Sequence, residues 1–391
     1  MKKIDVLIIG AGISGLTFAH WCKQRHLSTV VLEKNARIGG LIQSAQFEDF
    51  WVELGAHTCF NSYGHLIDIM KEVDLIPHLQ TRATKKFQFY KNQTVRSIPS
   101  QLHFLELLFH LPALFSSSKK DKTVKEYYQT LVGKRNYQDV FQHAFNAVIC
   151  QDAQHFPADL LFRKKPQRKE IARSFIFPNG IQTLPNKIAE NIDCYTEQHI
   201  QSISQDQNKL FEIKTDQETF QAKYLVIATP VNVAATLLEN IAPQMGEMLK
   251  EIPISTVESF AVKVPKEMVK LKPFAGLIGA EENFYSVVSR DTLNDEKYRG
   301  FTFHFKAARC DEKAKLQTIS TVLNISVDQI LEKTSTINQL PALRPEHNRL
   351  IQQVEKLLQN QPLALIGNYF QGVSMEDCAS RSFAEFNRLC R

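Results

Sequence analysis

The hydrophobic pattern of the first 33 residues predicts a strand, a helix and a second strand. Residues 4–9 are dominated by Ile, Leu and Val, which is typical of a strand buried on both faces of a parallel sheet. Residues 16–26 predict a helix, and the run STVVL at 28–32 predicts the next parallel strand. Together they make a β-α-β unit, for which a right-handed crossover is expected.

The period of the pattern changes in the middle of the chain. Residues 97–162 follow a helix-type pattern, with proline breaks and the polar linker SSSKKDK at 116–122. Strand-type runs return between 253 and 310, where VESFAVKV, NFYSVVS and GFTFHF indicate a second sheet. We therefore expect a helical insertion and a separate sheet.

Two further regions have the α/β character of the N-terminus. The first region runs from 175 to 230, and its predicted elements are a helix near 181–191 and strands at 198–203, 208–214, 218–221 and 223–230. The second region, 363–391, consists of the strand LALIG, a polar turn and a predicted helix. We expect both regions to lie with the N-terminal unit.

Length and composition indicate a folded, enzyme-sized chain of roughly two domains. The 391 residues are 43% hydrophobic and 23% charged, within the usual range of globular proteins. The net charge of +6 is spread along the chain, so nucleic acid is not expected as a partner. The seven cysteines are scattered without a CxxC pair, which argues against disulfides or a metal site and favours reduced thiols in the cytoplasm.

One apolar stretch, LHFLELLFHLPALF at 102–115, is interrupted by two His, one Glu and one Pro. It falls short of the ~20 apolar residues that a membrane-spanning helix needs. We expect it either to make a peripheral membrane contact or to line an apolar cavity. The nearby basic run at 163–169 is interpreted as a solvated loop, or as a contact to anionic lipid or an acidic substrate.

The motif GAGISG at 10–15 stands directly after a predicted strand and before a predicted helix. In such a turn Gly10 permits the tight bend, Gly12 lets the backbone approach a pyrophosphate, and Gly15 lets helix and strand pack closely. The helix N-terminus offers free N–H groups and a partial positive charge to phosphates. The placement predicts a dinucleotide site.

Two features after the second strand select among the dinucleotides. Glu33 ends that strand, where its carboxylate can accept hydrogen bonds from both ribose hydroxyls and would repel a 2′-phosphate. This favours FAD or NAD over NADP. The second glycine pair, in RIGGL at 37–41, favours FAD, because an extended flavin needs close backbone approach along its pyrophosphate and ribityl chain.

Several segments resemble the flavin amine oxidase and protoporphyrinogen oxidase superfamily. Its N-terminal signature is similar to GAGISGL at 10–16, LEKNARIGGLIQS at 32–44 and FWVELGAH at 50–57. An internal element of the family is similar to FPNGIQTLP at 177–185. The closing segment of protoporphyrinogen oxidases resembles LPALRPEH at 340–347 and GNYFQGVSMEDC at 367–378.

The resemblance implies an α/β fold with a discontinuous domain arrangement. An FAD-binding Rossmann-like (GR2-type) parallel-sheet domain is expected to comprise residues 1–80, 173–250 and 337–391. The inserted substrate-binding domain, a mixed sheet plus a helical segment, is expected to comprise residues 81–172 and 251–336.

The resemblance also implies where the cofactor lies. His57 is expected near the isoalloxazine, the backbone of Ile200 near the adenine, and a helix starting near Ser374 with free amides toward the flavin pyrimidine carbonyl. The expected cofactor-binding residues are Gly10, Gly12, Ile13, Ser14, Gly15, Glu33, Lys34, Arg37, Gly39, Gly40, Leu41, Gly55, Ala56, His57, Ile200, Thr229, Gly367, Asn368, Val373 and Ser374.

The substrate side of the site is less well specified by the sequence. His57, Phe175, Phe177 and Tyr369 are expected as pocket walls, although each also suits core packing. No Ser-Gly-Gly-Cys attachment sequence occurs near the C-terminus, so FAD is expected to be held non-covalently. No arginine follows ELGA to pair with a propionate, which leaves Arg163, Arg173 and Arg290 as weak candidates.

Together these features predict an FAD-dependent oxidoreductase that passes a hydride from a small hydrophobic substrate to flavin N5, with O2 or a quinone as electron acceptor. The resemblance implies a porphyrinogen as that substrate. Three alternatives stay open: a flavin amine oxidase or carotenoid-type oxidoreductase, a UDP-galactopyranose mutase-like enzyme, and a flavin-binding protein that has lost catalysis. The sequence leaves the oligomeric state open.

Overall fold

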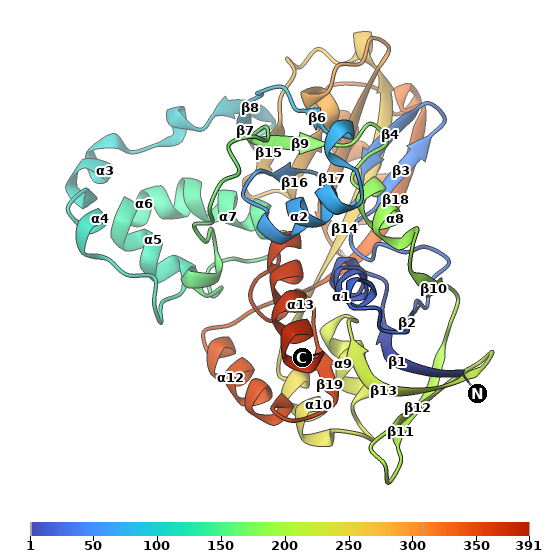
Figure 1. Ribbon diagram of the computed structural model, residues 1–391. Helices are drawn as coiled ribbons and strands as arrows, with labels where there is room; N and C mark the ends of the chain where they lie inside the picture. Colours follow the sequence, from blue (N-terminus) through green and yellow to red (C-terminus); the bar gives the residue numbers. More distant parts are fainter. Residues whose placement is uncertain (1, 308, 391) are drawn as a thin grey trace.

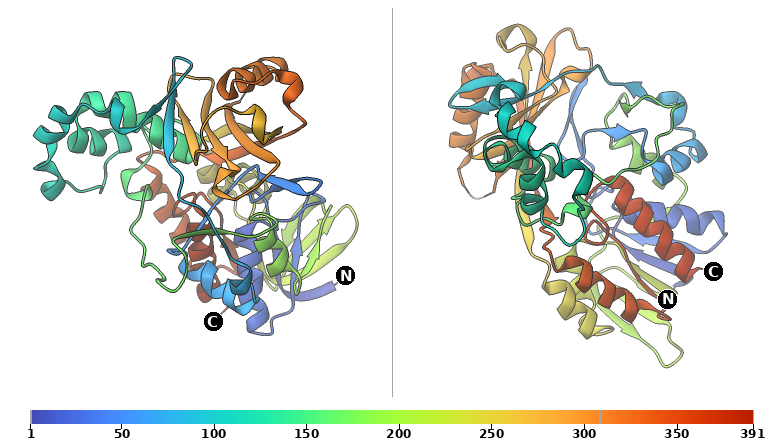
Figure 2. Two further views of the ribbon diagram at one scale, coloured as in Figure 1. Left: turned by 90° about the horizontal axis from the view of Figure 1, so that it is seen from above. Right: turned by 90° about the vertical axis from the view of Figure 1, so that its left-hand side faces the viewer.

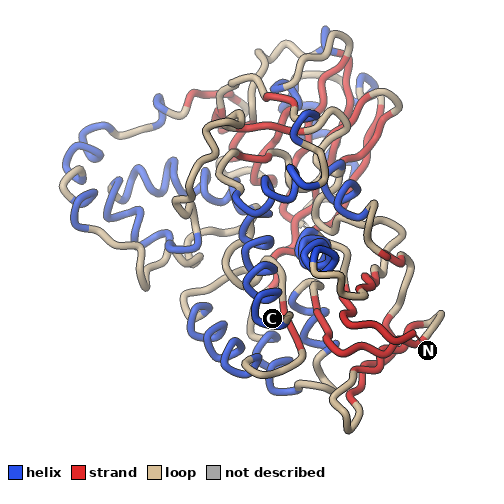
Figure 3. Tube along the Cα trace, in the orientation of Figure 1, coloured by secondary structure: helices blue, strands red, loops and turns tan. Residues whose placement is uncertain are grey.

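The computed structural model describes residues 2–307 and 309–390, and two seven-stranded sheets form its framework (Figures 1 and 3). The first sheet has the order β10-β2-β1-β13-β12-β11, and β19 also pairs with β13. Its mutually parallel strands are β1 (Lys2–Ile9), β2 (Thr29–Leu32), β10 (Asp193–Tyr195), β13 (Thr219–Ile227) and β19 (Leu363–Leu365). An antiparallel hairpin, β11 (Ile200–Gln205) and β12 (Phe211–Thr215), completes it. The expected parallel-sheet unit is confirmed.

The alternation of β1 side chains explains why helices cover both faces of the first sheet. Val6 and Ile8 belong to one hydrophobic cluster, which contains buried residues of α1 (Ile13–Gln24) and α13 (Met375–Leu389). Leu7 and Ile9 point the other way, into a second hydrophobic cluster. That cluster contains buried residues of α9 (Val231–Leu237), α10 (Pro243–Lys250) and α12 (His347–Leu358), among other helices.

The sequence predicts two separate strands at 218–221 and 223–230, and this prediction is wrong. The structure has a single strand there, β13, which ends at Ile227. Its first half alternates buried and partly exposed side chains and pairs with the hairpin strand β12. Its second half is continuously buried between β1 and β19. The change of pattern reflects a change of neighbours along one strand.

The second sheet is mixed, as expected, because β15 and β7 are parallel and the other neighbours are antiparallel. Its strands in order are β18 (Glu332–Pro341), β14 (Ile254–Pro265), β17 (Tyr298–Lys306), β16 (Phe284–Ser289), β15 (Gly276–Gly279), β7 (Phe87–Lys91) and β8 (Thr94–Ser97). Helix α11 (Glu312–Leu323) packs in its hydrophobic cluster. The hairpin of β3 (Ser44–Phe47) and β4 (Phe50–Glu53) packs on Ala261 of β14.

A helical lobe projects from the second sheet, at the left of Figure 1 and of the left view in Figure 2. Its helices are α3 (Phe104–His110), α4 (Ala113–Ser116), α5 (Val124–Val132), α6 (Lys134–Asn136) and α7 (Gln142–Ile149). The apolar stretch 102–115 thus forms two short helices separated at Leu111–Pro112. No helix in the described part of the chain is long and apolar enough to cross a membrane.

Smaller elements connect the two sheets. A three-stranded sheet has the order β5 (Cys59–Phe60), β9 (Ser174–Ile176) and β6 (Gln80–Thr81), and two further helices are α2 (Gly64–Glu72) and α8 (Thr183–Ala189). The expected division into an FAD-binding and a substrate-binding domain stays a prediction, with residues 1 and 391 outside the described chain. Its boundary at 337 falls inside β18, which pairs with β14 as far as Pro341.

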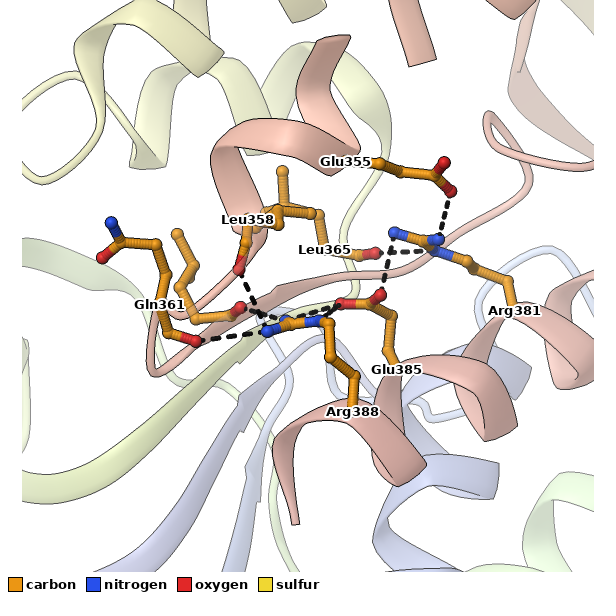
Figure 4. A network of polar contacts seen from close by, with 8 residues as sticks. Glu355, Leu358, Gln361, Leu365, Arg381, Glu385 and Arg388 are labelled. Carbon is orange, nitrogen blue, oxygen red and sulfur yellow. Dashed lines mark hydrogen bonds and ion pairs between the residues drawn. The ribbon is translucent and has the colours of Figure 1, made fainter. Parts of the chain in front are cut away.

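Helix α13 is tied to β19 and α12 by two of its arginines, Arg381 and Arg388 (Figure 4). Arg388 donates to the carbonyl oxygens of Leu358 (3.0 Å), Gln361 (3.2 Å) and Leu363 (2.6 Å), and to the carboxylate of Glu385 (2.8 Å). These carbonyls lie between the end of α12 and the start of β19, so a single guanidinium joins α12, β19 and α13.

Arg388→Met should therefore lower the free energy of unfolding by about 1–3 kcal/mol, because three carbonyl oxygens lose their charged donor. Urea unfolding of the flavin-loaded protein measures this. The matched control is Arg349→Met on the exposed side of α12, for which a change below about 0.5 kcal/mol is expected. Equal stability of the two variants would contradict the assignment.

Candidate functional site

Residues from both ends of the chain meet at the carboxyl edge of the first sheet. Ile9 of β1 lies opposite Ile227 of β13, which in turn lies opposite Leu365 of β19. Gly10, Thr229 and Gly367 follow these strands, so the structure brings these predicted residues to one edge. Open α/β sheets bind ligands at this edge.

The glycine turn after β1 leaves no room for side chains at two positions. Gly10 has a φ of +107°, and a Cβ there would lie 2.7 Å from the carbonyl oxygen of Ala228. A Cβ on Gly15 would lie 2.0 Å from the carbonyl oxygen of Gly10. The turn therefore requires glycine at both positions, as predicted.

The second glycine pair lies against the first turn. The amide of Gly39 donates to the carbonyl oxygen of Ala11 at 2.8 Å. A Cβ on Gly12 would meet only the Cα of Gly40, at 3.9 Å. Helix α1 begins here with no side-chain cap and no acidic residue in its first turn. Uncapped amides beside bare backbone suit a diphosphate group.

Glu33 is buried at the end of β2. Its Oε2 accepts a hydrogen bond from the amide of Ala11 (2.9 Å), and its Oε1 accepts from the backbone and side-chain nitrogens of Asn35 (3.0 and 2.8 Å). A carboxylate has about four acceptor positions, so the protein leaves room for about one ribose hydroxyl. The amide of Gln198 donates to the Glu33 carbonyl oxygen, which brings the start of β11, Ile200, close to this acid.

Arg37 supports the second glycine pair instead of reaching outward. Its guanidinium donates to the carbonyl oxygens of Ile38 (2.8 Å), Gly40 (2.6 Å) and Ile42 (2.7 Å), and to Gln182. Next to it, Lys34 and Leu41 are exposed at the same edge. Arg37 therefore positions the backbone on which a ligand would lie.

Residues 53–57, called the ELGAH segment below, pass beside the turn that contains the second glycine pair. A Cβ on Gly55 would lie 1.8 Å from the carbonyl oxygen of Leu41, so residues 55–57 run directly alongside it. The second sheet holds the segment from the other side, where Thr302 Oγ1 donates to the Glu53 carbonyl oxygen (2.7 Å). Asn338 likewise donates to the carbonyl oxygen of Leu54 at 3.1 Å.

Helix α13 starts at Met375, as predicted, but its N-terminus is less open than expected. Ser374 and Asp377 form a capping box, in which each backbone amide donates to the side chain of the other residue. Lys165 from the basic run pairs with Asp377 at 2.7 Å. The first-turn amides that the box does not use are those of Met375 and Glu376.

A buried hydroxyl marks the same edge. Thr229 Oγ1 has no hydrogen-bond partner within the described residues, although buried hydroxyls are normally satisfied. Thr229 directly follows the strand end that packs on Gly10. An incoming polar ligand would satisfy it.

A small cavity of about 20 Å³, enough for one water molecule, lies between the second sheet, strand β4 and strand β9 of the three-stranded sheet. Its walls include Trp51, Glu53, His57, Arg82 and Arg290. Burial raises the pKa of Glu53 to about 7, although its carboxyl accepts hydrogen bonds from backbone and side chain. Burial, with the positive charge of Arg82 next in weight, lowers the pKa of His57 to about 3, so its imidazole is neutral at physiological pH.

The two arginines of the cavity differ in their partners. Arg290 pairs with Asp295 at 3.2 Å, and its guanidinium lies 4.7 Å from the Trp51 ring. Arg82 donates to the hydroxyls of Thr292 (3.0 Å) and Thr58, and forms no ion pair within residues 2–307 and 309–390. It is a partly buried cation whose hydrogen-bond partners are neutral.

Other predicted residues lie elsewhere. Phe175, Phe177 and Tyr369 are completely buried in the hydrophobic clusters and present no surface to a cavity, so they are not used below as pocket walls. Of the candidate arginines, Arg290 lines the cavity, whereas Arg163 and Arg173 are exposed and do not. Sequence reasoning missed Arg82 and Glu53, because no local motif marks either side chain.

The parallel sheet, the uncapped helix α1 and the two glycine turns define a dinucleotide-binding protein of the Rossmann-like class. Among the described residues, no group of His, Cys, Asp or Glu is arranged to hold a metal ion. The family model of flavin-containing amine oxidoreductases matches residues 13–268. The chain belongs to this family, and its cofactor is a flavin.

Individual relatives are distant. The chain is 20% identical to coproporphyrinogen III oxidase of Bacillus subtilis (strain 168), over 98% of this chain and 97% of that protein. It is 25% identical over 65% of its length to a Dictyostelium discoideum protein classed as a flavin-containing monoamine oxidase A, and spans 63% of that relative.

Solved structures share the fold over nearly the whole chain. A proposed protoporphyrinogen oxidase from Exiguobacterium sp. 255-15 superimposes with a TM-score of 0.77 at 16% identity, covering 99% of this chain and 98% of that one. A putrescine oxidase variant gives a TM-score of 0.75 at 13% identity, covering 99% of both chains. These likenesses confirm the expected fold, and they include both branches of the superfamily.

Gly12→Ala separates cofactor binding from folding. The added Cβ meets only the Cα of Gly40 at ordinary contact distance, so the free energy of unfolding of the flavin-free chain should change by less than about 1 kcal/mol. The same methyl group occupies the face that a pyrophosphate approaches, so the purified variant should lose most of its flavin absorbance. Full flavin content with unchanged stability would contradict the placement.

Glu53→Gln tests the raised pKa of the buried acid. A carboxyl whose pKa rises from 4.5 to about 7 on folding stabilises the folded protein below pH 4.5 and loses that contribution as the pH rises to about 7. Glutamine cannot ionise, so wild type should lose up to about 3 kcal/mol relative to the variant across this interval. Urea unfolding at a series of pH values measures the difference, and a constant difference would contradict the shift.

Proposed function

We propose that this chain is an FAD-dependent oxidoreductase that dehydrogenates a hydrophobic substrate bearing carboxylates, of the porphyrinogen type. The observation that carries the proposal is Arg82, a partly buried cation without a carboxylate partner beside the ELGAH segment. Burial lowers the pKa of Arg82. A guanidinium keeps its proton in proteins, so Arg82 stays charged. A substrate carboxylate would supply the missing partner.

When bound, FAD supplies the hydride acceptor and passes electrons on to O2 or a quinone. The chain's own residues bind, orient and exclude water. The residues that fit the cofactor without a covalent bond are the two glycine turns, Glu33, Thr229 and the first turn of α13. Neutral His57 adds no charge beside the flavin ring, and its low pKa makes it a poor base, so His57 is not assigned as the proton acceptor of the reaction.

The charge of the cavity favours a carboxylate over an ammonium group. Arg82 and Arg290 supply two positive charges, against the carboxylate of Asp295 and a Glu53 side chain that is only partly ionised near neutral pH. A protonated amine brought near Arg82 would be repelled, whereas a propionate would be attracted. This supports the coproporphyrinogen oxidase branch among the relatives over the amine oxidases.

The proposal is tested by anaerobic mixing of the flavin-loaded protein with coproporphyrinogen III or with benzylamine. We expect the porphyrinogen to bleach the flavin anaerobically, and porphyrin fluorescence to follow only after O2 is admitted, because the porphyrin needs three two-electron rounds and each flavin accepts one. Bleaching with the amine alone would overturn the proposal, and no bleaching with either would favour a flavoprotein without this activity.

Arg82→Met should weaken porphyrinogen binding by roughly tenfold to a hundredfold, the worth of a hydrogen bond to a charged group. The matched control is Arg173→Met, which removes an exposed arginine outside the cavity and should leave the binding unchanged. The concentration dependence of the bleaching rate separates weaker binding from slower chemistry. Equal effects of the two substitutions would remove Arg82 from the site.

A further inference from the structure

Helices α3 and α4 expose an unusual number of large apolar side chains. Phe109 is 82% exposed and Phe115 is 93% exposed, so the segment does not line a cavity of this chain. The outward-facing residues, called the apolar tip below, are Phe104, Leu105, Leu108, Phe109, Leu111, Leu114 and Phe115. A contiguous patch of this kind marks an interaction surface.

The amphipathic character of α3 is inverted. Its polar side chains face the protein: Glu106 accepts hydrogen bonds from the amides of Arg135 (3.0 Å) and Asn136 (2.9 Å), and His110 pairs with the Thr130 carbonyl oxygen (2.8 Å). Just before the helix, His103 donates its amide to the Asn136 side chain at 2.8 Å. A surface helix normally buries its apolar side, whereas here hydrogen bonds anchor the polar side and hold the apolar side in solvent.

Glu106 is fitted closely to its place. Gly133 has a φ of +86°, and a Cβ there would lie 2.3 Å from the Cδ atom of Glu106. The glycine is therefore required for the carboxylate to reach the amides at the start of α6. The fit of Glu106 against α6 therefore fixes the orientation of the apolar tip, and the segment is not loosely attached.

Exposed cations lie on segments that adjoin the apolar tip in sequence or through hydrogen bonds. Lys120 follows α4, and Lys134 and Arg135 lie in α6, the helix to which Glu106 is bonded. Arg163 and Lys164 follow Phe162, whose carbonyl oxygen accepts a hydrogen bond from Lys119 at 3.4 Å. None of these five exposed cations, Lys120, Lys134, Arg135, Arg163 and Lys164, forms an ion pair within the described chain.

Three acidic side chains of the lobe are bonded within the lobe, and Asp121 beside Lys120 is exposed. Glu106 is bonded to α6, Glu126 to its own helix cap at Thr123, and Asp139 to His103. Exposed cations together with an apolar tip complement a partner that has an apolar interior and an anionic outer face. An anionic lipid bilayer has both properties.

We propose that the helical lobe docks on an anionic membrane surface, with the apolar tip entering the acyl boundary and the five cations contacting lipid headgroups. This is a peripheral contact, because the helices are far too short to span a bilayer. The inference does not depend on the proposed substrate. On this proposal, the lobe is exposed to water when the protein is free and contacts lipid when the protein is bound to the membrane.

The test is cosedimentation of the flavin-loaded protein with vesicles of pure phosphatidylcholine or of equal parts phosphatidylcholine and phosphatidylglycerol. We expect stronger binding to the anionic vesicles, reduced by added salt. The double variant Leu105→Gln, Phe109→Gln should bind roughly tenfold or more weakly to them. Lys120→Gln with Lys134→Gln should weaken binding to the anionic vesicles by roughly fivefold per charge.

The matched control replaces two exposed apolar side chains of the second sheet region, Leu331→Gln and Ile337→Gln, and should bind like wild type. Flavin content confirms that each variant is folded. Absence of binding to both vesicles, or equal loss in the control, would overturn the proposal. A different result would be self-association of the wild type without vesicle binding. If the double variant Leu105→Gln, Phe109→Gln abolished that self-association, the apolar tip would be assigned to contact with a second copy of this chain instead.

Discussion

The whole cofactor edge depends on backbone packing against backbone where side chains are absent. Gly10 lies on the end of β13, Gly15 on the carbonyl oxygen of Gly10, and Gly40 on Gly12. A single Cβ at Gly15 would separate α1 from β1, and with it the helix N-terminus from the strand ends. Because α13 packs on α1 through Ser382 and Ser14, the C-terminal part of the site depends on the same close approach.

The second sheet completes the edge from the opposite direction. Thr302 and Asn338 fix the carbonyl oxygens of the ELGAH segment, while the hairpin of β3 and β4 carries that segment between the two sheets. The cavity beside this segment has both polar and apolar walls. An acid with a raised pKa and a cation whose hydrogen-bond partners are hydroxyls lie together there.

The sequence was informative wherever the signal was local. The β-α-β unit, the turn at 10–15, Glu33 and the start of α13 each depend on neighbouring residues, and the structure has each of these elements. It was uninformative for Arg82, which follows a two-residue strand and reaches the cavity only because β6 pairs with β9. The splitting of β13 was an error of the same origin, since strand partners far apart in sequence define that strand.

The helical lobe shows a different limit of sequence reasoning. Periodicity places His103, Glu106 and His110 on one side of α3 and Leu105 and Phe109 on the other, but it does not say which side faces the protein. The usual rule buries the apolar side. Here two amides at the start of α6 bind the carboxylate, for which the glycine at 133 leaves space, and this polar fit outweighs the apolar preference. Exposure of the apolar tip is thus specified by hydrogen-bond partners about 30 residues away in sequence.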